Sequence, residues 1–455
     1  MKAVTWSQIA KWAGGQLLQG TPAETVAALS TDTRALKGGE LFVALKGDKY
    51  DAHEFLGEAL KAPIAGMLLH DLPLETEAFR GAIVRVRDTL TGLQSLARHY
   101  RRYLGIPIVG ITGSSGKTST KDLVRAVLAE RWKVAATQGN LNNHIGVPLT
   151  LLSMDEQTEV GVVEMGMNHP GEIEVLAEIG APDGAIITNV GVAHIEHMGS
   201  REAIALEKGM LAEAIEPGGW VILSAHDDFT ESIRARCRAE VITGGVGMGD
   251  VRASGLEIDW DGVKFDLSFG GHTVSASIPV PAEHMVRNAT LAVAAGLRMG
   301  LSLEEAAAGV GQIQLTAGRL QRKLVADIPV LDDSYNANPE SVKAALRTLR
   351  ELPVRGRRIA VLGRMGELGE HADEQHWLVG KAVAENGIDI LVGIGEEGAR
   401  LVSGAGEGVE AFLFADHAQV AKFLRENATG EDLVLLKGSR SARMETVLTH
   451  LNESA

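Results

Sequence analysis

A glycine-rich turn between a predicted strand and a predicted helix is the segment best suited to chemistry. Apolar residues 106–111 predict a buried strand, and an amphipathic helix begins at about Ser119. The turn between them consists of Thr112, Gly113, Ser114, Ser115, Gly116, Lys117 and Thr118. Such a turn directs backbone N–H groups toward one point, where Lys117 adds a charge and the Thr118 hydroxyl can reach Mg²⁺. Although Ile111 replaces the first glycine of the usual G-x-x-x-x-G-K-[ST] pattern, T-G-x-x-G-K-T predicts a nucleoside triphosphate site rather than a chance turn.

Polar residues after the neighbouring predicted strands could bind a metal ion beside this turn. Glu164 ends the apolar segment VGVVE, and a carboxylate at the carboxyl end of a parallel strand suits Mg²⁺, although it could instead cap a helix or form an ion pair. His194 and His197 lie in the loop after the next strand. Strand ends on one edge converge, so His194 could reach the same metal or its water, or it could be structural. Lys208, on the following helix, by itself indicates only an exposed lysine.

Several other polar segments could bind substrate groups, and each also has an ordinary structural explanation. The first contains Asn140, Asn142 and Asn143, whose amides suit hydroxyls or carboxylates but which also form turns. In the second, Asp332-Asp333 could hold a ribose and Asn336 and Asn338 a second substrate, while Asn338 before Pro339 also caps a helix. Arg319 could reach phosphates if domains close, or be a solvated hinge residue. Thr31, Asp32 and Arg34 could bind substrate or form a solvated turn.

The pattern of strands and helices that positions these residues predicts an α/β protein. A chain of 455 residues is too long for one core, and we expect three domains. They are a small N-terminal α/β substrate domain (1–83), a central P-loop domain with a parallel sheet (84–318), and a C-terminal domain with a nucleotide-fold pattern (319–455). Within them, residues 251–280 predict an antiparallel extension, residues 283–299 a helix, and residues 323–333 one strand.

Composition restricts the partners of this chain. The net charge of −15 and the scarcity of aromatic residues argue against nucleic acid, although a local cradle could still bind a nucleotide. Cys237 is the single cysteine, so no internal disulfide or CxxC metal site can form. No apolar run is long enough to span a membrane and no signal peptide is recognised, so we expect a cytoplasmic protein. We separately expect a monomer.

Six segments, in this order between about Ser30 and Glu445, resemble the Mur ligases: TGSSGKTSTK, GNLNNHIGVPLTLL, EMGMNHPGEI, NVGVAHIEHMGS, DDSYNANPESVKAAL and KGSRSARME. The resemblance implies a ligase of peptidoglycan precursor synthesis that joins D-alanyl-D-alanine to UDP-N-acetylmuramoyl-tripeptide through an acyl phosphate. It further implies a UDP-sugar domain, a central ATPase domain and a C-terminal Rossmann-like domain, with ATP between the last two. A folylpolyglutamate-synthase-like ligase and a P-loop switch or motor are the alternatives.

The resemblance also implies roles for individual residues. Residues Thr112 to Thr118 would bind the ATP phosphates, Asn288 would lie at the adenine, Arg319 at a phosphate and Asp333 at the ribose. Two Mg²⁺ sites are implied, with ligands Thr118, Glu164, His194 and a carbamylated Lys208. Thr31, Asp32 and Arg34 would meet the uridine nucleotide, and the peptide side would include Asn336, Asn338, Ser439 and Arg440.

Two departures from the family pattern limit what can be transferred. Arg364, in GRMGELG, replaces an acidic residue and so reverses a charge. Met285 stands where many relatives have an asparagine, so the role of His284 is open.

Overall fold

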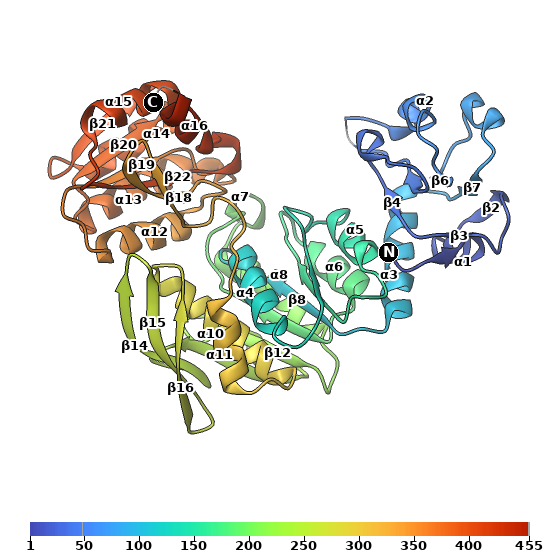
Figure 1. Ribbon diagram of the computed structural model, residues 1–455, viewed down its shortest axis with the longest axis horizontal. Coiled ribbons are helices and arrows are strands. Elements are labelled where there is room, and N and C mark those ends of the chain that lie inside the picture. The colour runs from blue at the N-terminus through green and yellow to red at the C-terminus, as the bar shows by residue number, and fades with distance from the viewer. Residues whose placement is uncertain (48, 454–455) are drawn as a thin grey trace.

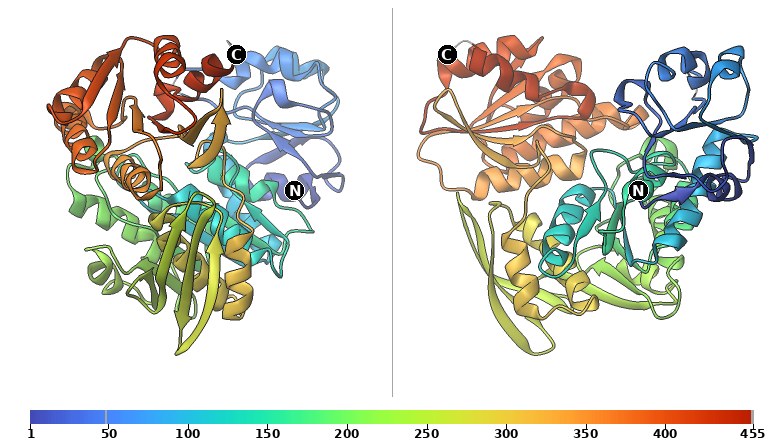
Figure 2. Two further views of the ribbon diagram at one scale, coloured as in Figure 1. Left: turned by 60° about the vertical axis from the view of Figure 1, so that its left-hand side comes forward. Right: turned by 45° about the vertical axis from the view of Figure 1, so that its right-hand side comes forward.

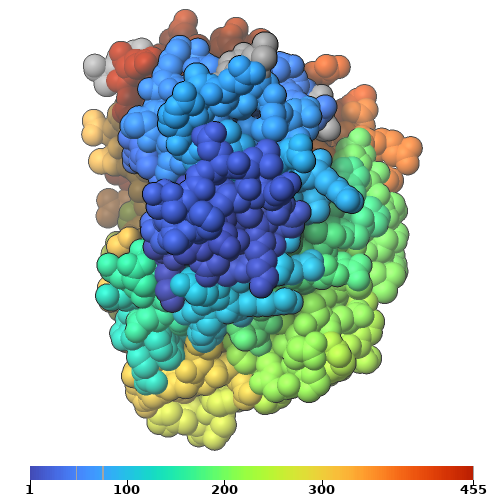
Figure 3. All heavy atoms as spheres, turned by 90° about the vertical axis from the view of Figure 1, so that its right-hand side faces the viewer, coloured from blue at the N-terminus to red at the C-terminus, as the bar shows by residue number. Residues whose placement is uncertain are grey.

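The computed structural model describes residues 1–47 and 49–453 and contains three main sheets, each within its own part of the chain. Figure 1 shows the central unit in the middle, with the N-terminal unit (blue) and the C-terminal unit (orange to red) at opposite ends. The two views of Figure 2 show both terminal units above the central one. On the face drawn in Figure 3, the N-terminal unit forms the upper part of the surface. The α/β fold expected from the sequence is confirmed.

The N-terminal unit is a five-stranded sheet in the order β2-β7-β6-β5-β4, of which β4 to β7 are parallel. The strands are Gln16–Gln19 (β2), Leu29–Ser30 (β4), Leu41–Val43 (β5), Gly66–Leu69 (β6) and Ala82–Arg85 (β7). Helix α1 (Trp6–Trp12) and the short pair β1 (Val4–Thr5) and β3 (Thr25–Val26) lie beside it, and α2 spans Leu56–Ala59. Helix α3 (Thr89–Leu104) leads to the central unit and ends at Gly105, whose φ of 67° is the left-handed geometry of a C-terminal cap.

The central unit is a nine-stranded sheet in the order β16-β15-β14-β13-β12-β11-β8-β10-β9. The strands are Ile108–Thr112 (β8), Val134–Ala136 (β9), Val160–Glu164 (β10), Gly184–Ile187 (β11), Trp220–Ser224 (β12), Glu240–Val246 (β13), Val251–Asp259 (β14), Gly262–Phe269 (β15) and His272–Ile278 (β16). Strands β8 to β13 pair in parallel, while β14 to β16 form the predicted antiparallel extension. The phosphate loop follows β8, which has β10 and β9 on one side of it in the sheet and β11 to β13 on the other. The carboxyl end of a strand at which the strand order reverses is the usual place for a ligand in an open parallel sheet.

The parallel strands of this sheet are rich in apolar residues because helices cover both faces of the sheet and bury the side chains on both sides. One face packs against α5 (Gly146–Ser153), α6 (Glu172–Gly180) and α8 (Arg201–Glu213), and the other against α4 (Lys117–Leu128), α10 (Glu283–Arg298) and α11 (Leu303–Gly311). Helix α10 matches the helix predicted over residues 283–299. Across the described residues, no helix is both long and apolar enough to cross a lipid bilayer.

The C-terminal unit is a six-stranded sheet in the order β17-β18-β22-β19-β20-β21. Its strands are Gln321–Val325 (β17), Ile328–Asp333 (β18), Arg358–Leu362 (β19), Ile390–Ile394 (β20), Glu410–Phe414 (β21) and Leu433–Lys437 (β22). Its helices are Pro339–Glu351 (α12), Ala372–Glu385 (α13), Gly395–Ala405 (α14), His417–Asn427 (α15) and Glu445–Glu453 (α16).

The prediction of a single strand over residues 323–333 is wrong, because β17 and β18 form an antiparallel hairpin. Ala326 and Asp327 make its turn with φ values of 49° and 61°. Two consecutive left-handed residues match the right-handed twist of a hairpin, but Asn-Gly or Asp-Gly is the usual signal and Ala-Asp is not. The hairpin places Asp333 at the end of β18, where the segment that leads to α12 begins.

Candidate active site

The backbone of the phosphate loop requires glycine at two positions. Gly113 has a φ of 152°, and a Cβ added there would lie 1.8 Å from Oγ1 of Thr188. Gly116 has a φ of 77° and precedes α4, and a Cβ there would lie 3.2 Å from Nδ2 of Asn288. These glycines therefore let the loop approach the next strand end and α10 closely, and Asn288 on α10 lies beside the loop.

Asn189, which the sequence analysis missed, braces the same loop. Its carbonyl accepts a hydrogen bond from the backbone N–H of Ser114 (3.0 Å), and its Oδ1 accepts one from the N–H of Ser115 (2.9 Å). Its Nδ2 donates to Oγ of Ser115 (2.7 Å), and Thr188 Oγ1 donates to the Ser115 carbonyl (2.6 Å). The available signal was the position of Thr188 and Asn189 directly after β11, at the carboxyl edge that carries the loop.

Lys117 and Thr118 begin α4 and point to different partners. Lys117 Nζ donates to the Gly113 carbonyl (2.6 Å), so the side chain folds back over the loop. Burial lowers the pKa of Lys117, and the negative charge of Glu164 partly opposes this effect. Thr118 Oγ1 donates to Oε2 of Glu164 (3.1 Å), which joins the loop to the end of β10.

Glu164 is buried, and its second oxygen binds one of the three candidate asparagines. Asn142 Nδ2 donates to Oε1 of Glu164 (2.9 Å). Asn143 instead accepts from the N–H groups of Ile145 and Gly146 at the start of α5, as a turn-forming residue would. Asn140 is exposed. Of the three, only Asn142 is thus linked by a hydrogen bond to the candidate metal ligand.

His194 meets a residue of the C-terminal unit that sequence reasoning had not selected. Its Nδ1 lies 2.6 Å from Oε2 of Glu367, and both residues have left-handed backbones, with φ values of 66° and 61°. Burial lowers the pKa of His194, while the Glu367 carboxylate opposes the decrease. Glu367 belongs to the segment GRMGELG, which we had considered only for Arg364. Backbone strain of this kind is concentrated at functional sites.

Lys208 is not the exposed helical lysine that its sequence context suggested. Its side chain on α8 is only 1% exposed. Burial, and secondarily the charge of Lys117, lower the pKa of Lys208 well below the usual value for a lysine. Its position on the helix gave no sign of this burial, and the charge that acts on it, that of Lys117, comes from a distant part of the chain.

Arg319 and Asp333 bring the C-terminal unit to the loop. Arg319 NH2 donates to Thr118 Oγ1 (3.3 Å), and the guanidinium lies 4.4 Å from the centre of the Tyr335 ring. Asp333 Oδ2 pairs with Nζ of Lys437 at 2.5 Å, and its Oδ1 accepts from the Leu320 N–H. Burial lowers the pKa of Lys437, although Asp333 opposes the change.

A cavity of about 320 Å³ lies between the central and C-terminal units, lined by both. Its walls include Gly116, Asn288, Arg319, Asp333, Arg347 and Lys437. His284 also lines it, and burial together with the charges of Lys437, Arg347 and Arg287 lowers its pKa to about 4. Met285 also lines the cavity, although the residue is almost fully buried.

The peptide-side candidates are divided between structural and interdomain contacts. Asn338 Oδ1 caps α12 by accepting from the Ser341 N–H, while its Nδ2 donates to the Ser114 carbonyl (3.2 Å) across the two units. Asn336 Oδ1 accepts from the Arg440 N–H (3.3 Å). The Arg440 side chain itself pairs with Glu445.

Ser439 and Arg364 lie in adjoining loops at the same edge of the C-terminal sheet. The buried Ser439 donates its N–H to the Arg364 carbonyl (2.8 Å). The Arg364 guanidinium points to Glu397 on α14, with Nε 3.2 Å from Oε1, and its side chain is 56% exposed. The charge reversal at this position is therefore balanced within the C-terminal unit.

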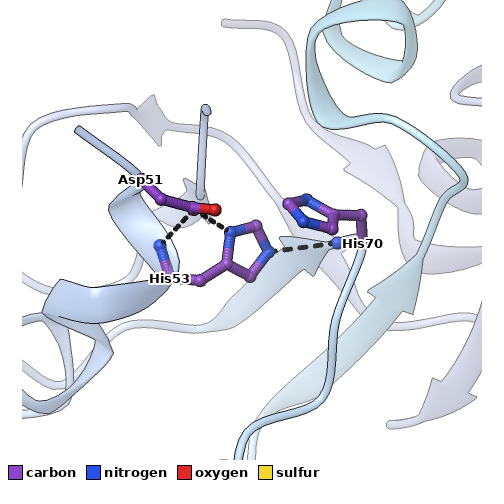
Figure 4. A group of neighbouring side chains, drawn as sticks. All are labelled: Asp51, His53 and His70. Carbon is purple, nitrogen blue, oxygen red and sulfur yellow. Dashed lines mark hydrogen bonds and ion pairs between the residues drawn. The ribbon is translucent and has the colours of Figure 1, made fainter. Parts of the chain in front are cut away.

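A second polar group lies in the N-terminal unit, at the carboxyl edge of its parallel strands. Thr31, Asp32 and Arg34 follow β4, and Asp32 pairs with the exposed Arg34 (2.7 Å). Asp51, His53 and His70, drawn in Figure 4, follow β5 and β6, with potential ligand atoms within 4.8 Å of one another.

Both ring nitrogens of His53 are already hydrogen-bonded. Its Nδ1 lies 2.7 Å from the Asp51 carboxylate, and its Nε2 accepts from the His70 N–H at 3.2 Å (Figure 4). This arrangement explains the group as a hydrogen-bonded brace between two loops.

Comparisons with known proteins match nearly the whole chain. Residues 111–296 match the Mur ligase middle domain, and residues 318–440 match the family described as Mur ligase, glutamate ligase domain. UDP-N-acetylmuramoyl-tripeptide–D-alanyl-D-alanine ligase of Bacillus subtilis (strain 168) is 36% identical, with 99% of this chain and 98% of that protein covered. The protein of the same name from Escherichia coli (strain K12) is 35% identical, covering 100% and 99%.

Solved structures agree with the sequence comparisons. A crystal structure of MurF from Acinetobacter baumannii superposes with a TM-score of 0.92 at 32% identity, covering 100% of this chain and 99% of the other. MurF from Thermotoga maritima in complex with ADP gives a TM-score of 0.84 at 25% identity, covering 94% and 97%. A folylpolyglutamate synthase of Mycobacterium tuberculosis, at 19% identity and a TM-score of 0.64, shares the fold.

Proposed function

This chain belongs to the Mur ligase family, and from that premise we propose that it joins D-alanyl-D-alanine to UDP-N-acetylmuramoyl-tripeptide at the expense of ATP. The names of the full-length relatives support this assignment. The structural observation that carries it is the phosphate loop of the central unit facing Arg319, Asp333 and Lys437 across one cavity. A nucleotide bound there would lie between two units, so its terminal phosphate could be presented to a second substrate as they close.

We propose that the triphosphate occupies the loop from Thr112 to Thr118. The N-terminus of α4, which begins at Lys117, favours negative charge, and Lys117 needs only to exchange the Gly113 carbonyl for a phosphate oxygen. Arg319 adds a second positive charge beside Thr118. Asn288 would contact the adenine side, and Asp333, held by Lys437, would accept hydrogen bonds from the ribose hydroxyls.

The proposed reaction has two steps. A peptide carboxylate oxygen attacks the γ-phosphorus, the bond to the β–γ bridging oxygen breaks, and an acyl phosphate and ADP form. The neutral amine of D-alanyl-D-alanine then attacks the carbonyl carbon, the C–N bond forms, phosphate leaves and the amine loses a proton. Lys117, Arg319 and the loop N–H groups stabilise the negative charge that gathers as γ-phosphate and carboxylate meet.

We propose two Mg²⁺ sites at Thr118, Glu164, His194 and a carbamylated Lys208. The donor set fits, because a buried carboxylate and a hydroxyl already face each other there. The low pKa of Lys208 favours the neutral amine, which can add to CO₂ with loss of a proton and become an anionic oxygen ligand. When bound, Mg²⁺ would offset phosphate charge and orient its oxygens.

The remaining assignments concern the two ends of the chain and its setting. We propose that residues 1–83 bind the UDP-sugar, with Thr31, Asp32 and Arg34 near the uridine nucleotide, and that residues 84–318 and 319–455 form the ATP-binding and C-terminal Rossmann-like domains. Asn140, Asn142 and Asn143, with Asn336, Asn338, Ser439 and Arg440, would line the path of the peptide substrates. We further propose that the enzyme acts as a monomer in the cytoplasm, where ATP is available.

One assay separates this function from its alternatives. Phosphate release should require ATP together with both UDP-N-acetylmuramoyl-tripeptide and D-alanyl-D-alanine. Release with ATP alone would instead indicate a P-loop switch, and release with folate and glutamate a folylpolyglutamate-synthase-like ligase. Replacing the tripeptide's third residue, lysine by diaminopimelate, in the same assay would identify the natural acceptor.

A further inference from the structure

A buried ion pair behind the phosphate loop has no part in the chemistry proposed above. Lys121 and Asp122, on α4, are 5% and 3% exposed, and Lys121 Nζ lies 2.9 Å from Asp122 Oδ1. Lys121 also donates to the Thr137 carbonyl (3.0 Å), and Thr137 Oγ1 accepts from the Glu164 N–H (2.9 Å). The pair is therefore part of a network that reaches the candidate metal ligand at the end of β10.

The other carboxylate oxygen of Asp122 binds the linker between the central and C-terminal units. Its Oδ2 accepts hydrogen bonds from the N–H (2.8 Å) and the Oγ1 hydroxyl (2.9 Å) of Thr316. Neutralising Lys121 would require only Oδ1. The second oxygen thus serves the linker, which runs from the end of α11 to the start of β17.

The linker touches α4 at two points. Thr118 and Asp122 are four residues apart on α4 and so lie on one face of the helix. Thr316 contacts Asp122, and three residues later Arg319 NH2 contacts Thr118 Oγ1 (3.3 Å). The linker therefore runs along α4 toward the phosphate loop, with Asp122 as its anchor.

Arg319 lies between α11 and β17, outside any helix or strand. The flanking residues Gly318 and Leu320 have φ values of 70° and 47°, so the chain turns sharply on both sides of it. Its Nε is buried and lacks a hydrogen-bond partner among the described residues, as expected of a group that awaits a ligand oxygen. The C-terminal unit holds this turn from one side, because Tyr335 stacks on the guanidinium (4.4 Å) and Asp333 binds the Leu320 N–H (3.3 Å). The contact between Thr316 and Asp122 attaches the same turn to α4.

We propose that Asp122 is a positioning residue of the ligase: by binding Thr316 it sets the place of Arg319 at the nucleotide phosphates. The inference depends on one part of the proposed function, namely that a nucleotide binds in the phosphate loop beside Arg319. It can be tested by nucleotide affinity alone, without the tripeptide or the dipeptide.

The test measures the affinity of AMP-PNP by titration calorimetry, with melting temperature as a parallel readout. Thr316→Val removes one hydrogen bond to Asp122 and should weaken AMP-PNP binding about tenfold, whereas Thr316→Ser, which keeps the hydroxyl, should bind like wild type. Asp122→Asn cannot serve Lys121 and Thr316 with two equivalent oxygens and should weaken binding at least as much.

A matched control and a double variant separate positioning from stability. Asp250 binds Thr243 through the same N–H and hydroxyl contacts (both 2.8 Å), so Thr243→Val should lower the melting temperature without changing AMP-PNP affinity. In an Arg319→Ala background, Thr316→Val should cause no further loss of affinity.

Equal affinity of Thr316→Val and wild type, or a further tenfold loss in the Arg319→Ala background, would overturn the proposal. Neither result would affect the proposed function, which depends on substrate-dependent phosphate release by the wild-type enzyme.

Discussion

Substituting Gly113 by alanine should disable the phosphate loop for a steric reason that can be calculated from the structure. The added Cβ would lie 1.8 Å from Thr188 Oγ1, and ordinary contact begins at 3.4 Å. Either the two strand ends separate by up to about 1.6 Å, or the Thr188 hydroxyl rotates away and loses its hydrogen bond to the Ser115 carbonyl. Overpacking of this kind costs about 1 to 3 kcal/mol. The φ of 152° adds about 1 to 3 kcal/mol for a residue with a Cβ.

The effect on catalysis should exceed the effect on folding. A displacement of about 1 Å from productive geometry lowers rates on the order of 100-fold. We therefore expect Gly113→Ala to fold with a lower melting temperature and to lose at least about 100-fold in kcat/KM for ATP, measured by phosphate release.

Two further variants isolate the contact. Thr188→Ala removes the clashing oxygen and leaves Cβ of residue 188 at 3.1 Å, so Gly113→Ala/Thr188→Ala should recover part of the lost kcat/KM. Gly105 also has a positive φ (67°), but a Cβ added there would meet nothing within 4 Å. Gly105→Ala should therefore lower the melting temperature without changing kcat/KM for ATP. Near-wild-type activity of Gly113→Ala, or no recovery in the double variant, would refute the reasoning.

Three other variants test separate parts of the account. Lys117→Ala should abolish phosphate release while circular dichroism shows an intact fold, and near-wild-type turnover would contradict the role of the loop. Lys208→Ala should be inactive but partly restored by small carboxylic acids, whereas full activity without them would dismiss the carbamate. His284 has a folded pKa of about 4 against 6.5 for the free side chain, so its contribution to stability is present above pH 6.5 and declines as the pH falls toward 4. The loss of stability is at most about 3 kcal/mol. His284→Gln should therefore flatten the dependence of the melting temperature on pH between pH 4 and 6.5, and an unchanged dependence would exclude this role of His284.

The sequence predicted best where a local pattern determines the structure. The β8–loop–α4 unit, the antiparallel extension and helix α10 were foreseen because apolar periodicity and glycine turns are local properties. It failed at the β17–β18 hairpin, where Ala326 and Asp327 adopt a turn that their residue types do not favour.

Residues whose roles depend on distant contacts could not be identified in the same way. Lys208 is buried and is affected by the charge of Lys117, which lies far away in the chain. Glu367 meets His194 only because the C-terminal unit folds back onto the central one. Asn189 could have been suspected from its place after β11, but its bracing of Ser114 and Ser115 required coordinates.

The central claim is that a carboxylate oxygen of the acceptor peptide accepts the γ-phosphoryl group of ATP held in the loop. The most direct measurement labels the terminal carboxylate of UDP-N-acetylmuramoyl-tripeptide with ¹⁸O and analyses the released phosphate by mass spectrometry. We expect one labelled oxygen in each phosphate formed during synthesis of the amide. Phosphate that contains no oxygen from the carboxylate would contradict the account.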